Sequence, residues 1–563
     1  MDVDKPTITR HAFNKQSLEA LFQDEYVARL FPVVYIIFDE KKMQAYIGET
    51  TNVPIRLATH LKHPKKNKLK KVYVISCEQF NKSAVLDIEA NLIQCLPALE
   101  FKLFNGNGGI IHHNYYQKQI YLEQFSQIWQ QLSFDKVQPK TLSDIKNSDL
   151  FKYSPYKALN YDQYTSAIEI LNILVSGKKK SLFVDGIAGT GKTILAIYLI
   201  KLLSDIHRYD IDDFNAFDEN LRDLLVELKN KYPKDKYPNG LQIALVVPMT
   251  SLRSTLKKVF RSIQGLTGAM VISPYDVVKK PYDLLLVDES HRLCRRTAII
   301  NYDAYDKVNK KLGIDGTQLD WIMQSSSQQL FFYDAAQSIK PADVRKVDFD
   351  ALRAQLSSTE VKLVSQLRCR GGKDYIVFVD KLLNNKLPAN TQVFSNKDYE
   401  LILFDSIQTL ITQLQRRENE YGLCRTTAGY AWEWVSSNQP DTPDAIIEGV
   451  KFTWNRDTND WIHSTTDLQE LGCIHTTQGY DLNYVGIIFG RDIRYDKINQ
   501  RITTHKNNYF DTKGKSGIQD PQELHDYIIN IYKTLMYRGI SGTYVYACDP
   551  DLREYFAKVM VKM

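Results

Sequence analysis

A glycine-rich loop that could bind phosphate is the clearest chemical feature of the chain. Residues 186–193 read GIAGTGKT, in which glycines let backbone N–H groups close around phosphate oxygens, the lysine reaches the terminal phosphates and the threonine hydroxyl faces Mg²⁺. The residues expected to hold the nucleotide are Gly186, Gly189, Gly191, Lys192 and Thr193. Residues 284–290, LLLVDES, are an apolar strand that ends in two adjacent carboxylates, as such a loop requires. The sequence therefore predicts binding and hydrolysis of a nucleoside triphosphate.

Two tyrosines nearer the N-terminus form a second chemical pattern. The runs Val33-Val-Tyr35 and Tyr46-Ile-Gly48 are expected on neighbouring strands, where one phenol could orient or deprotonate a water. Arg56, on the helix that follows, could steady a pentavalent phosphate. His60 lies one helical turn beyond Arg56 on the same face, where a structural histidine is favoured over a second base.

A carboxylate also interrupts an apolar helical stripe. The neighbours of Glu89 at helical spacing are apolar, from Val85 to Ile93, so its side chain is expected among buried groups. A buried carboxylate without a partner is costly, and an ion pair with a lysine or with Arg56 is one way to satisfy it.

These residues need strands and helices to position them. A small α/β unit is predicted from a helix over 83–96 and from strands at 33–38, 44–48 and 72–76. A parallel sheet is predicted from Tyr156 to Val344, where helical segments alternate with apolar strands at 182–184, 243–247, 284–287 and 330–333. The alternation resumes after Val361, with strands at 400–404, 484–489 and 542–547.

The fold class predicted is therefore α/β, with a small N-terminal domain followed by two parallel-sheet lobes. The expected parts are an α/β domain over 1–117, a helical connector and linker over 118–154, a first nucleotide-binding lobe over 155–350 and a second lobe over 351–563.

The bulk composition limits the function classes. With 563 residues and a net charge of only +6, any nucleic-acid surface must come from local patches. One candidate is the acid-free stretch Arg56 to Lys71, in which phosphate contact and a solvated face are weighted equally; its lysines are Lys62, Lys65, Lys66, Lys68, Lys70 and Lys71. Seven scattered cysteines predict reduced thiols, and a polar N-terminus without a signal peptide predicts a soluble cytoplasmic protein without a membrane partner.

Several segments, in order from Lys157 to the end, resemble a superfamily-1 helicase core, and most closely the bacterial Schlafen-like DNA/RNA helicase family. The matching segments are LNYDQYTSAI, VVPMTSLRSTLKKVF (246–260), LLLVDESHRL, YDAAQS (333–338), SQLRCRGG, IHTTQGYDLNYVGIIFG (474–490) and YKTLMYRGISGTYVYACD. The resemblance implies two RecA-like lobes with an ATP site between them.

The same resemblance implies residue roles. Gln163 would read adenine, residues 246–260 would touch a single strand, Asp288 would bind Mg²⁺, Glu289 would polarise the attacking water and Gln337 would sense the γ-phosphate. Arg368 and Arg538 would stabilise the transferring phosphoryl group from the second lobe. Gln478 and Gly479 would lie at the centre of the segment that couples nucleotide state to strand contact.

The N-terminal tyrosine pattern, with Thr50, Asn52 and Arg56 after it, resembles a GIY-YIG nuclease. In that family the glutamate corresponding to Glu89 binds a single divalent metal, which implies Mg²⁺ or Mn²⁺ here, and Asn105 or Asn107 would supply the late asparagine. Two positions depart from the family pattern: Val33 replaces the first glycine, and the acidic Glu49 follows YIG, where Lys, Gln or Ser is frequent.

Taken together, the residues and the resemblances predict an ATP-dependent nucleic-acid translocase or helicase that carries a metal-dependent endonuclease. Such a fusion implies nucleic-acid processing or anti-phage defence, with DNA favoured over RNA as partner. Two alternatives remain: an ATP-gated nucleic-acid sensor whose N-terminal domain only docks, and a signalling NTPase that binds no nucleic acid.

Overall fold

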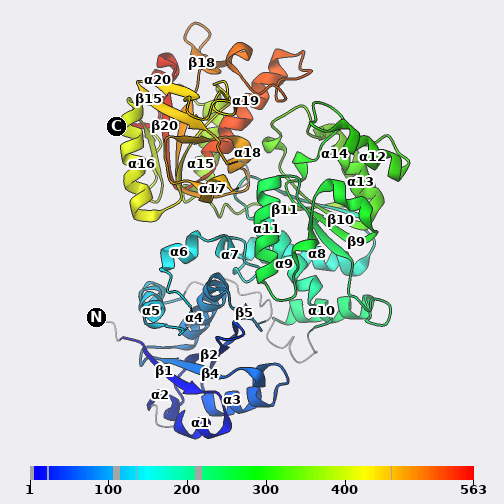
Figure 1. Ribbon diagram of the computed structural model, residues 1–563, viewed down its shortest axis with the longest axis vertical. Coiled ribbons are helices and arrows are strands. Elements are labelled where there is room, and N and C mark those ends of the chain that lie inside the picture. Colours follow the sequence, from blue (N-terminus) through cyan, green and yellow to red (C-terminus); the bar gives the residue numbers. More distant parts are fainter. Residues whose placement is uncertain (1–4, 22–24, 106–114, 136, 209–217, 458–459) are drawn as a thin grey trace. The chain divides into compact units, whose positions relative to one another are not determined.

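The computed structural model of the protein describes residues 5–21, 25–105, 115–135, 137–208, 218–457 and 460–563 (Figure 1). By compactness the chain divides into two units. The first comprises Met1–Ile168, Ile197–Gly240 and Lys257–Met270; the second comprises Glu169–Ala196, Leu241–Leu256 and Val271–Met563.

The first unit contains a five-stranded sheet. Its order is β1 (Thr7–Ala12), β4 (Lys71–Ser76), β2 (Val33–Asp39), β3 (Gln44–Thr50) and β5 (Lys102–Leu103). All neighbours are antiparallel except β3 and β5. The central strands agree with the sequence-based expectation, whereas β1 was missed because its residues alternate only between exposed and half-buried.

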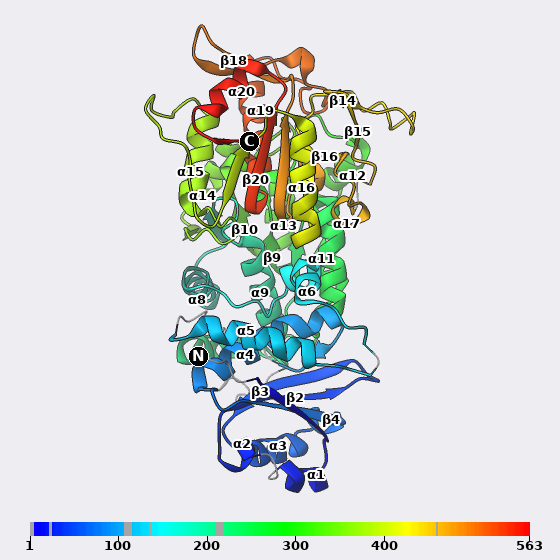
Figure 2. The same ribbon diagram turned by 90° about the vertical axis from the view of Figure 1, so that its left-hand side faces the viewer.

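Helices cover both faces of this sheet. Figures 1 and 2 show α1 (Lys15–Ala20), α2 (Glu25–Ala28) and α3 (Val53–Lys62) on one face, and α4 (Lys82–Cys95) and α5 (Lys118–Gln131) on the other. Asparagine caps fix where the two helices nearest the chemistry begin: the side chain of Asn52 accepts the N–H of Ile55 in α3, and that of Asn81 accepts the N–H of Ala84 in α4.

The segment expected to be a connector is an integral part of this unit. The ring of Phe134 packs within 5.2 Å of the Phe38 ring centroid and within 4.9 Å of that of Phe101. Asp135 forms ion pairs at 2.8 Å with Arg10 and Lys71. The boundary predicted at residue 117 therefore cuts through a packed body, because the sequence showed a polar helix but not the core that its far end completes.

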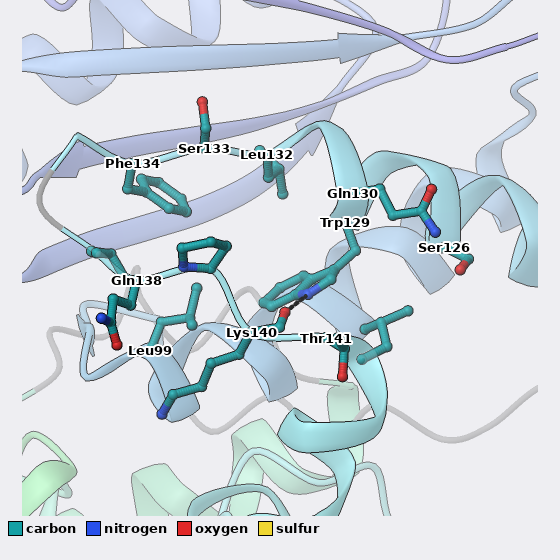
Figure 3. A pocket seen from close by; sticks show the side chains of 13 residues that line it. Leu99, Ser126, Trp129, Gln130, Leu132, Ser133, Phe134, Gln138, Lys140 and Thr141 are labelled. Atoms are coloured by element: carbon teal, nitrogen blue, oxygen red, sulfur yellow. Dashed lines mark hydrogen bonds between the residues drawn. The ribbon is translucent and has the colours of Figure 1, made fainter. Parts of the chain in front are cut away.

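A cavity of about 500 Å³ lies beneath this segment. Figure 3 shows Trp129 of α5 at its wall, with the indole N–H donating to the carbonyl of Lys140 at 2.8 Å. The short helices α6 (Leu142–Asn147) and α7 (Asp149–Lys152) follow.

The second unit holds two sheets, and the first is entirely parallel. Its order is β11 (Ser358–Leu363), β6 (Ser181–Gly186), β10 (Ser326–Tyr333), β9 (Tyr282–Val287), β7 (Ile243–Val246) and β8 (Val271–Ile272). Since β11 pairs with β6, the first sheet extends to Leu363, beyond the boundary predicted at residue 350.

The other sheet has eight strands. Their order is β14 (Ala445–Ile447), β15 (Val450–Trp454), β16 (Glu470–Gly472), β13 (Cys424–Ala428), β17 (Leu482–Phe489), β20 (Gly539–Ala547), β12 (Glu400–Leu403) and β21 (Val561–Lys562), parallel except for β14 and β15. A separate hairpin joins β18 (Ile493–Asp496) to β19 (Arg501–Thr504).

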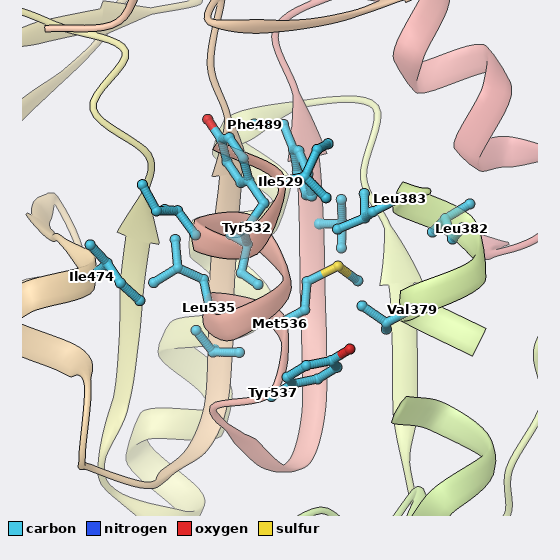
Figure 4. Close-up of a cluster of buried hydrophobic side chains, with 14 of the residues drawn as sticks. Val379, Leu382, Leu383, Ile474, Phe489, Ile529, Tyr532, Leu535, Met536 and Tyr537 are labelled. Carbon is cyan, nitrogen blue, oxygen red and sulfur yellow. The ribbon is translucent and has the colours of Figure 1, made fainter. Parts of the chain in front are cut away.

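Helices α15 (Gly372–Leu383), α19 (Pro521–Met536) and α20 (Pro550–Ala557) bury one face of this sheet, and α16 (Ile407–Tyr421) buries the other. Figure 4 shows Val379 and Leu383 of α15 in one cluster with Tyr532 and Met536 of α19 and Phe489 of β17. The remaining α-helices are α8 (Tyr161–Ser176), α9 (Lys192–Ser204), α10 (Glu219–Lys231), α11 (Thr250–Ser262), α12 (Tyr302–Leu312), α13 (Gln318–Ser325), α14 (Lys346–Arg353), α17 (Trp461–Ser464) and α18 (Ile474–Thr477).

Candidate nucleotide and nuclease sites

The phosphate loop joins the end of β6 to the start of α9. Gly189 and Gly191 adopt φ angles of 86° and 79°, which favour glycine. A Cβ on Gly189 would collide with the side chain of Gln366 and come within 2.9 Å of the Cβ of Arg368. The loop is therefore built around an open backbone at the N-terminus of a helix, a setting that favours phosphate oxygens.

Lys192 and Thr193 lie where nucleotide chemistry needs them. The Lys192 ammonium donates to the carbonyls of Gly186 at 2.6 Å and Ile187 at 3.1 Å, and it lies 3.7 Å from a carboxylate oxygen of Asp334. The Thr193 hydroxyl donates to Asp288 at 2.8 Å. A hydroxyl and a carboxylate in contact at the helix start fit Mg²⁺ bound with a nucleotide.

Glu289 directly follows Asp288 and is held in an unusual conformation. Its φ of 48° is uncommon for a residue with a Cβ, and its carboxylate lies 3.0 Å from Nε2 of His291. Burial favours the neutral acid, but His291, Lys192 and Arg538 outweigh it and hold the pKa of Glu289 below its usual value. Burial and the neighbouring Glu289 raise the pKa of Asp288. The ionised Glu289 can polarise a water.

A polar chain links the two sheets of the second unit. The Gln337 amide donates to Asp334 at 2.6 Å, and its carbonyl accepts from the Arg538 guanidinium at 3.2 Å. Arg538 is 1% exposed and also donates to the backbone carbonyl of Tyr480 at 3.3 Å. Through Asp334 the chain continues to Lys192, so the predicted γ-phosphate sensor and one predicted arginine lie together at the loop.

The backbone of Arg368 contacts the phosphate loop, whereas its guanidinium is paired with another residue. Its N–H donates to the carbonyl of Gly189 at 3.2 Å, whereas its guanidinium forms an ion pair with Asp481. Asp481 belongs to the segment 474–490. A role of Arg368 on the phosphoryl group therefore requires it to exchange this partner.

The segment 474–490, predicted to couple nucleotide state to strand contact, packs against α11. Most of α11 lies in the segment 246–260, which was predicted to touch a single nucleic-acid strand. Gly479 has a φ of 93°, and a Cβ there would meet Leu252 of α11 at 3.1 Å. The hydroxyls of Tyr480 and Thr255, also in α11, lie 2.6 Å apart. Gln163 lies at the start of α8 in the first unit, where its carbonyl accepts the N–H of Asn160 at 3.2 Å; its adenine-reading role stays a prediction.

The two tyrosines of the N-terminal sheet meet at one histidine. The Tyr35 hydroxyl and Nε2 of His60 are 2.8 Å apart, and the Tyr46 and His60 rings pack edge to face at 4.8 Å. Gly48 lies against the Tyr35 hydroxyl, which a Cβ at that position would strike. The sequence favoured a structural role for His60, but the structure makes it the direct partner of a phenol.

Burial sets the protonation of this cluster. Burial, followed by the charges of Lys66 and Arg56, lowers the pKa of His60 to about 3, so the ring is neutral at physiological pH. Burial raises the pKa of Tyr35 and Tyr46, while Arg56 opposes that shift for both phenols. The arginine thus favours whichever phenol loses its proton.

Glu89 lies half-buried on α4. Among the residues that the structure describes, which exclude 106–114, none forms a hydrogen bond or ion pair with its carboxylate. Burial, with the nearby Glu49, raises the pKa of Glu89 to about 8. The ion pair with Arg56 or a lysine, which the sequence left open, is therefore not formed in this part of the chain, and the partnerless carboxylate fits a hard divalent cation.

The other nuclease expectations divide into three. The Asn105 amide donates to the carbonyl of Ile47 at 2.8 Å and accepts its N–H at 3.0 Å, so it pins β3; Asn107 lies outside the described residues. Val33 is wholly buried in the same hydrophobic cluster as Tyr35. In the basic stretch, the Lys71 ammonium forms ion pairs at 2.8 Å with both Glu40 and Asp135.

The sequence analysis did not single out three residues that shape these sites. Asp334, Asp481 and His291 lie inside matched segments, so their position was a usable signal. Lys66 was predicted only as part of the basic stretch; its ammonium lies 3.6 Å from the Tyr46 ring centroid. Within the described ranges, no group of three or more His, Cys, Asp or Glu side chains is arranged to hold a metal ion. In the same part of the chain, no helix has the length and apolar character to cross a membrane.

Comparisons with known proteins identify two domains in the chain. Residues 179–549 match the family model for the Schlafen group 3 DNA/RNA helicase domain, and residues 31–98 match that for the GIY-YIG catalytic domain. An uncharacterized protein of Saccharomyces cerevisiae, YPL245W, is 25% identical over 412 residues, which are 67% of this chain and 84% of that protein.

Solved helicase structures are also similar, at low identity. Pif1 helicase from Candida albicans is 13% identical, with a TM-score of 0.27, over 71% of this chain and 97% of that one. A Bacteroides sp. Pif1 in complex with ADP-AlF4 is 10% identical, with a TM-score of 0.28, over 71% of this chain and 94% of that one.

Proposed function

Since the chain belongs to the Schlafen group 3 DNA/RNA helicase family and carries a GIY-YIG nuclease domain, we propose that it is an ATP-driven nucleic-acid translocase with a metal-dependent endonuclease, and that DNA is its substrate. The main support for an ATP-driven motor is a polar chain of side chains that joins the phosphate loop to the eight-stranded sheet. It runs from Lys192 through Asp334 and Gln337 to Arg538. A change at the γ-phosphate is thereby transmitted to both sheets.

In the motor, each residue has a defined task. Lys192 leaves its loop carbonyls for the β- and γ-phosphates, Glu289 polarises the attacking water, and Arg538 neutralises charge that develops on the phosphoryl group. Bound Mg²⁺ would be held by Thr193 and Asp288 and would neutralise phosphate charge. Arg368 joins Arg538 once it exchanges Asp481 for the nucleotide.

In the nuclease, the neutral His60 positions a phenol. Its Nε2 atom lies 2.8 Å from the Tyr35 hydroxyl and holds that oxygen where it can orient the attacking water. Arg56 stabilises the pentavalent phosphate. A divalent cation would be held by Glu89 and would stabilise the leaving oxygen.

The test uses the full chain, because residues past 117 complete the core of the nuclease unit. ATP hydrolysis and Mg²⁺- or Mn²⁺-dependent cleavage are measured with single-stranded, duplex and forked DNA and with RNA. We expect Lys192→Ala to lose ATP hydrolysis, and Glu89→Ala to lose cleavage while nucleic-acid-stimulated ATP hydrolysis persists. Wild-type cleavage by Glu89→Ala would remove the nuclease and favour the docking alternative.

The physiological setting follows from joining the two activities in one chain. A translocase attached to a phosphodiesterase is suited to processing DNA or restricting phage DNA. ATP hydrolysis that no DNA or RNA stimulates would instead support the signalling alternative.

A further inference from the structure

Three charged side chains lie near one another where β3 packs against α4. Glu49 follows Gly48 on β3, and both its carboxylate oxygens lie 2.5 Å from the ammonium of Lys82, the first residue of α4. Glu89 lies seven residues further along α4, which is about two helical turns and therefore the same face. Glu49 and Lys82 both act on the charge of Glu89, so the three groups are within electrostatic range.

The Glu49–Lys82 pair has little structural purpose. The Lys82 side chain is 60% exposed, and ion pairs so open to water contribute little to stability. A cation at the first position of a helix is also unfavourable, because the helix dipole places positive charge there. Lys82 therefore adds little to the stability of α4 or of the fold at this position.

The charges around this contact leave one carboxylate without a direct partner in the described part of the chain. Two cations act on the charge of Glu89, but Lys82 is bound to both oxygens of Glu49 and Arg56 is bonded to the two phenols, so Glu89 has no direct partner in the described part of the chain. Glu49 is only 17% exposed, so its charge is held in place rather than dispersed in water. A divalent cation can bind both carboxylates directly, and carboxylate oxygens are the ligands Mg²⁺ and Mn²⁺ prefer.

We infer that Glu49 is a second carboxylate ligand for the divalent cation of the nuclease, and that the Lys82 ammonium stands in for this cation until it binds. The inference rests on the proposed nuclease function, in which Glu89 holds the ion. Entry of the ion exchanges one ammonium for one divalent cation, so the Glu49–Lys82 pair opens as the ion binds. The acidic residue after YIG thus strengthens the cation site rather than blocking it.

The test is direct Mn²⁺ binding to the full chain without nucleotide or nucleic acid, followed by the electron paramagnetic resonance of free Mn²⁺ and by calorimetry. An Asp288→Asn background removes the carboxylate of the ATP site. We expect Glu49→Gln to weaken Mn²⁺ binding more than tenfold, and Glu89→Gln to abolish it. Lys82→Met should tighten binding several-fold, because it removes the competing ammonium. A gain in affinity cannot come from misfolding.

Asp87→Asn is the matched control. Asp87 lies on the same helix but is bonded to the Tyr115 hydroxyl at 3.1 Å, so its loss should leave Mn²⁺ affinity unchanged. Unchanged affinity in Glu49→Gln, with binding lost in Glu89→Gln, overturns this inference and leaves the nuclease standing. Unaltered binding in Glu89→Gln, or none in the parent protein, overturns the proposed metal-dependent nuclease itself.

Discussion

Asp492 is a buried acid in the short turn between β17 and β18, and its proton should control the stability of the eight-stranded sheet. Its side chain is 0% exposed, and one carboxylate oxygen accepts the Tyr532 O–H at 2.7 Å. The Tyr532 oxygen in turn accepts the N–H of Gly490 at 3.1 Å, which ties α19 to the end of β17. Burial raises the pKa of Asp492 from 3.8 to about 7, although the Tyr532 hydrogen bond opposes the shift.

The sign of the pH effect follows from this raised pKa. Below the unfolded pKa of 3.8 both states hold the proton, so the full stability is present. As the pH rises the unfolded chain releases its proton first, and stability is lost until the pH passes the folded pKa. Three pKa units at about 1.4 kcal/mol each give a loss of at most about 4 kcal/mol, of which about 2 kcal/mol falls between about pH 5.5 and about pH 8.5.

The perturbation is Asp492→Asn, which keeps an acceptor for the Tyr532 O–H and removes the titration. Urea unfolding of wild type and variant, followed by tryptophan fluorescence, is compared at both pH values. We expect the stability of the wild type relative to the variant to fall by about 2 kcal/mol at the higher pH. Asp496→Asn, at an aspartate of the nearby hairpin whose pKa is lowered rather than raised, serves as control and should not reproduce this fall. An equal wild-type–variant difference at the two pH values would refute the reasoning.

Three further predictions concern the active sites. Arg538→Ala should lower kcat for ATP hydrolysis by about a thousandfold or more while nucleotide binding persists, as measured by steady-state kinetics and equilibrium binding, because the group acts on the transition state; an unchanged kcat would show that Arg538 is structural. Asp481→Asn releases the Arg368 guanidinium, so hydrolysis without nucleic acid should rise and its stimulation by DNA should shrink, which a wild-type stimulation ratio would contradict. Tyr35→Phe should lower the single-turnover rate of DNA cleavage by about a hundredfold or more with little change in DNA affinity, because it removes the hydroxyl that orients the attacking water but keeps the ring; near-wild-type cleavage would transfer the role to Tyr46.

Patterns that are contiguous in the chain could be interpreted from the sequence alone. The phosphate loop and the acidic end of β9 are each built from neighbouring residues, so residue type and spacing already specify their chemistry. The strands that the sequence predicted at 284–287 and 330–333 agree with β9 and β10. Glu89 was identifiable because a charge within an apolar helical stripe conflicts with the local pattern.

Pairings between distant residues were decided by tertiary structure. Arg538 and Gln337 are 201 residues apart in the chain, and Tyr35 and His60 are 25 apart, so no local periodicity indicates that they touch. The partners of Glu49 and Arg368, Lys82 and Asp481, were likewise invisible from spacing.

The domain boundaries also differ from those predicted at residues 117 and 350, because they too depend on contacts between distant residues. Phe134 completes a core built from strands that precede it, and β11 joins the first sheet by pairing with β6. Sequence determines which side chains can do chemistry and which segments form strands and helices, because those properties are local. Only packing decides which of these side chains meet, because it depends on how the whole chain closes around its cores.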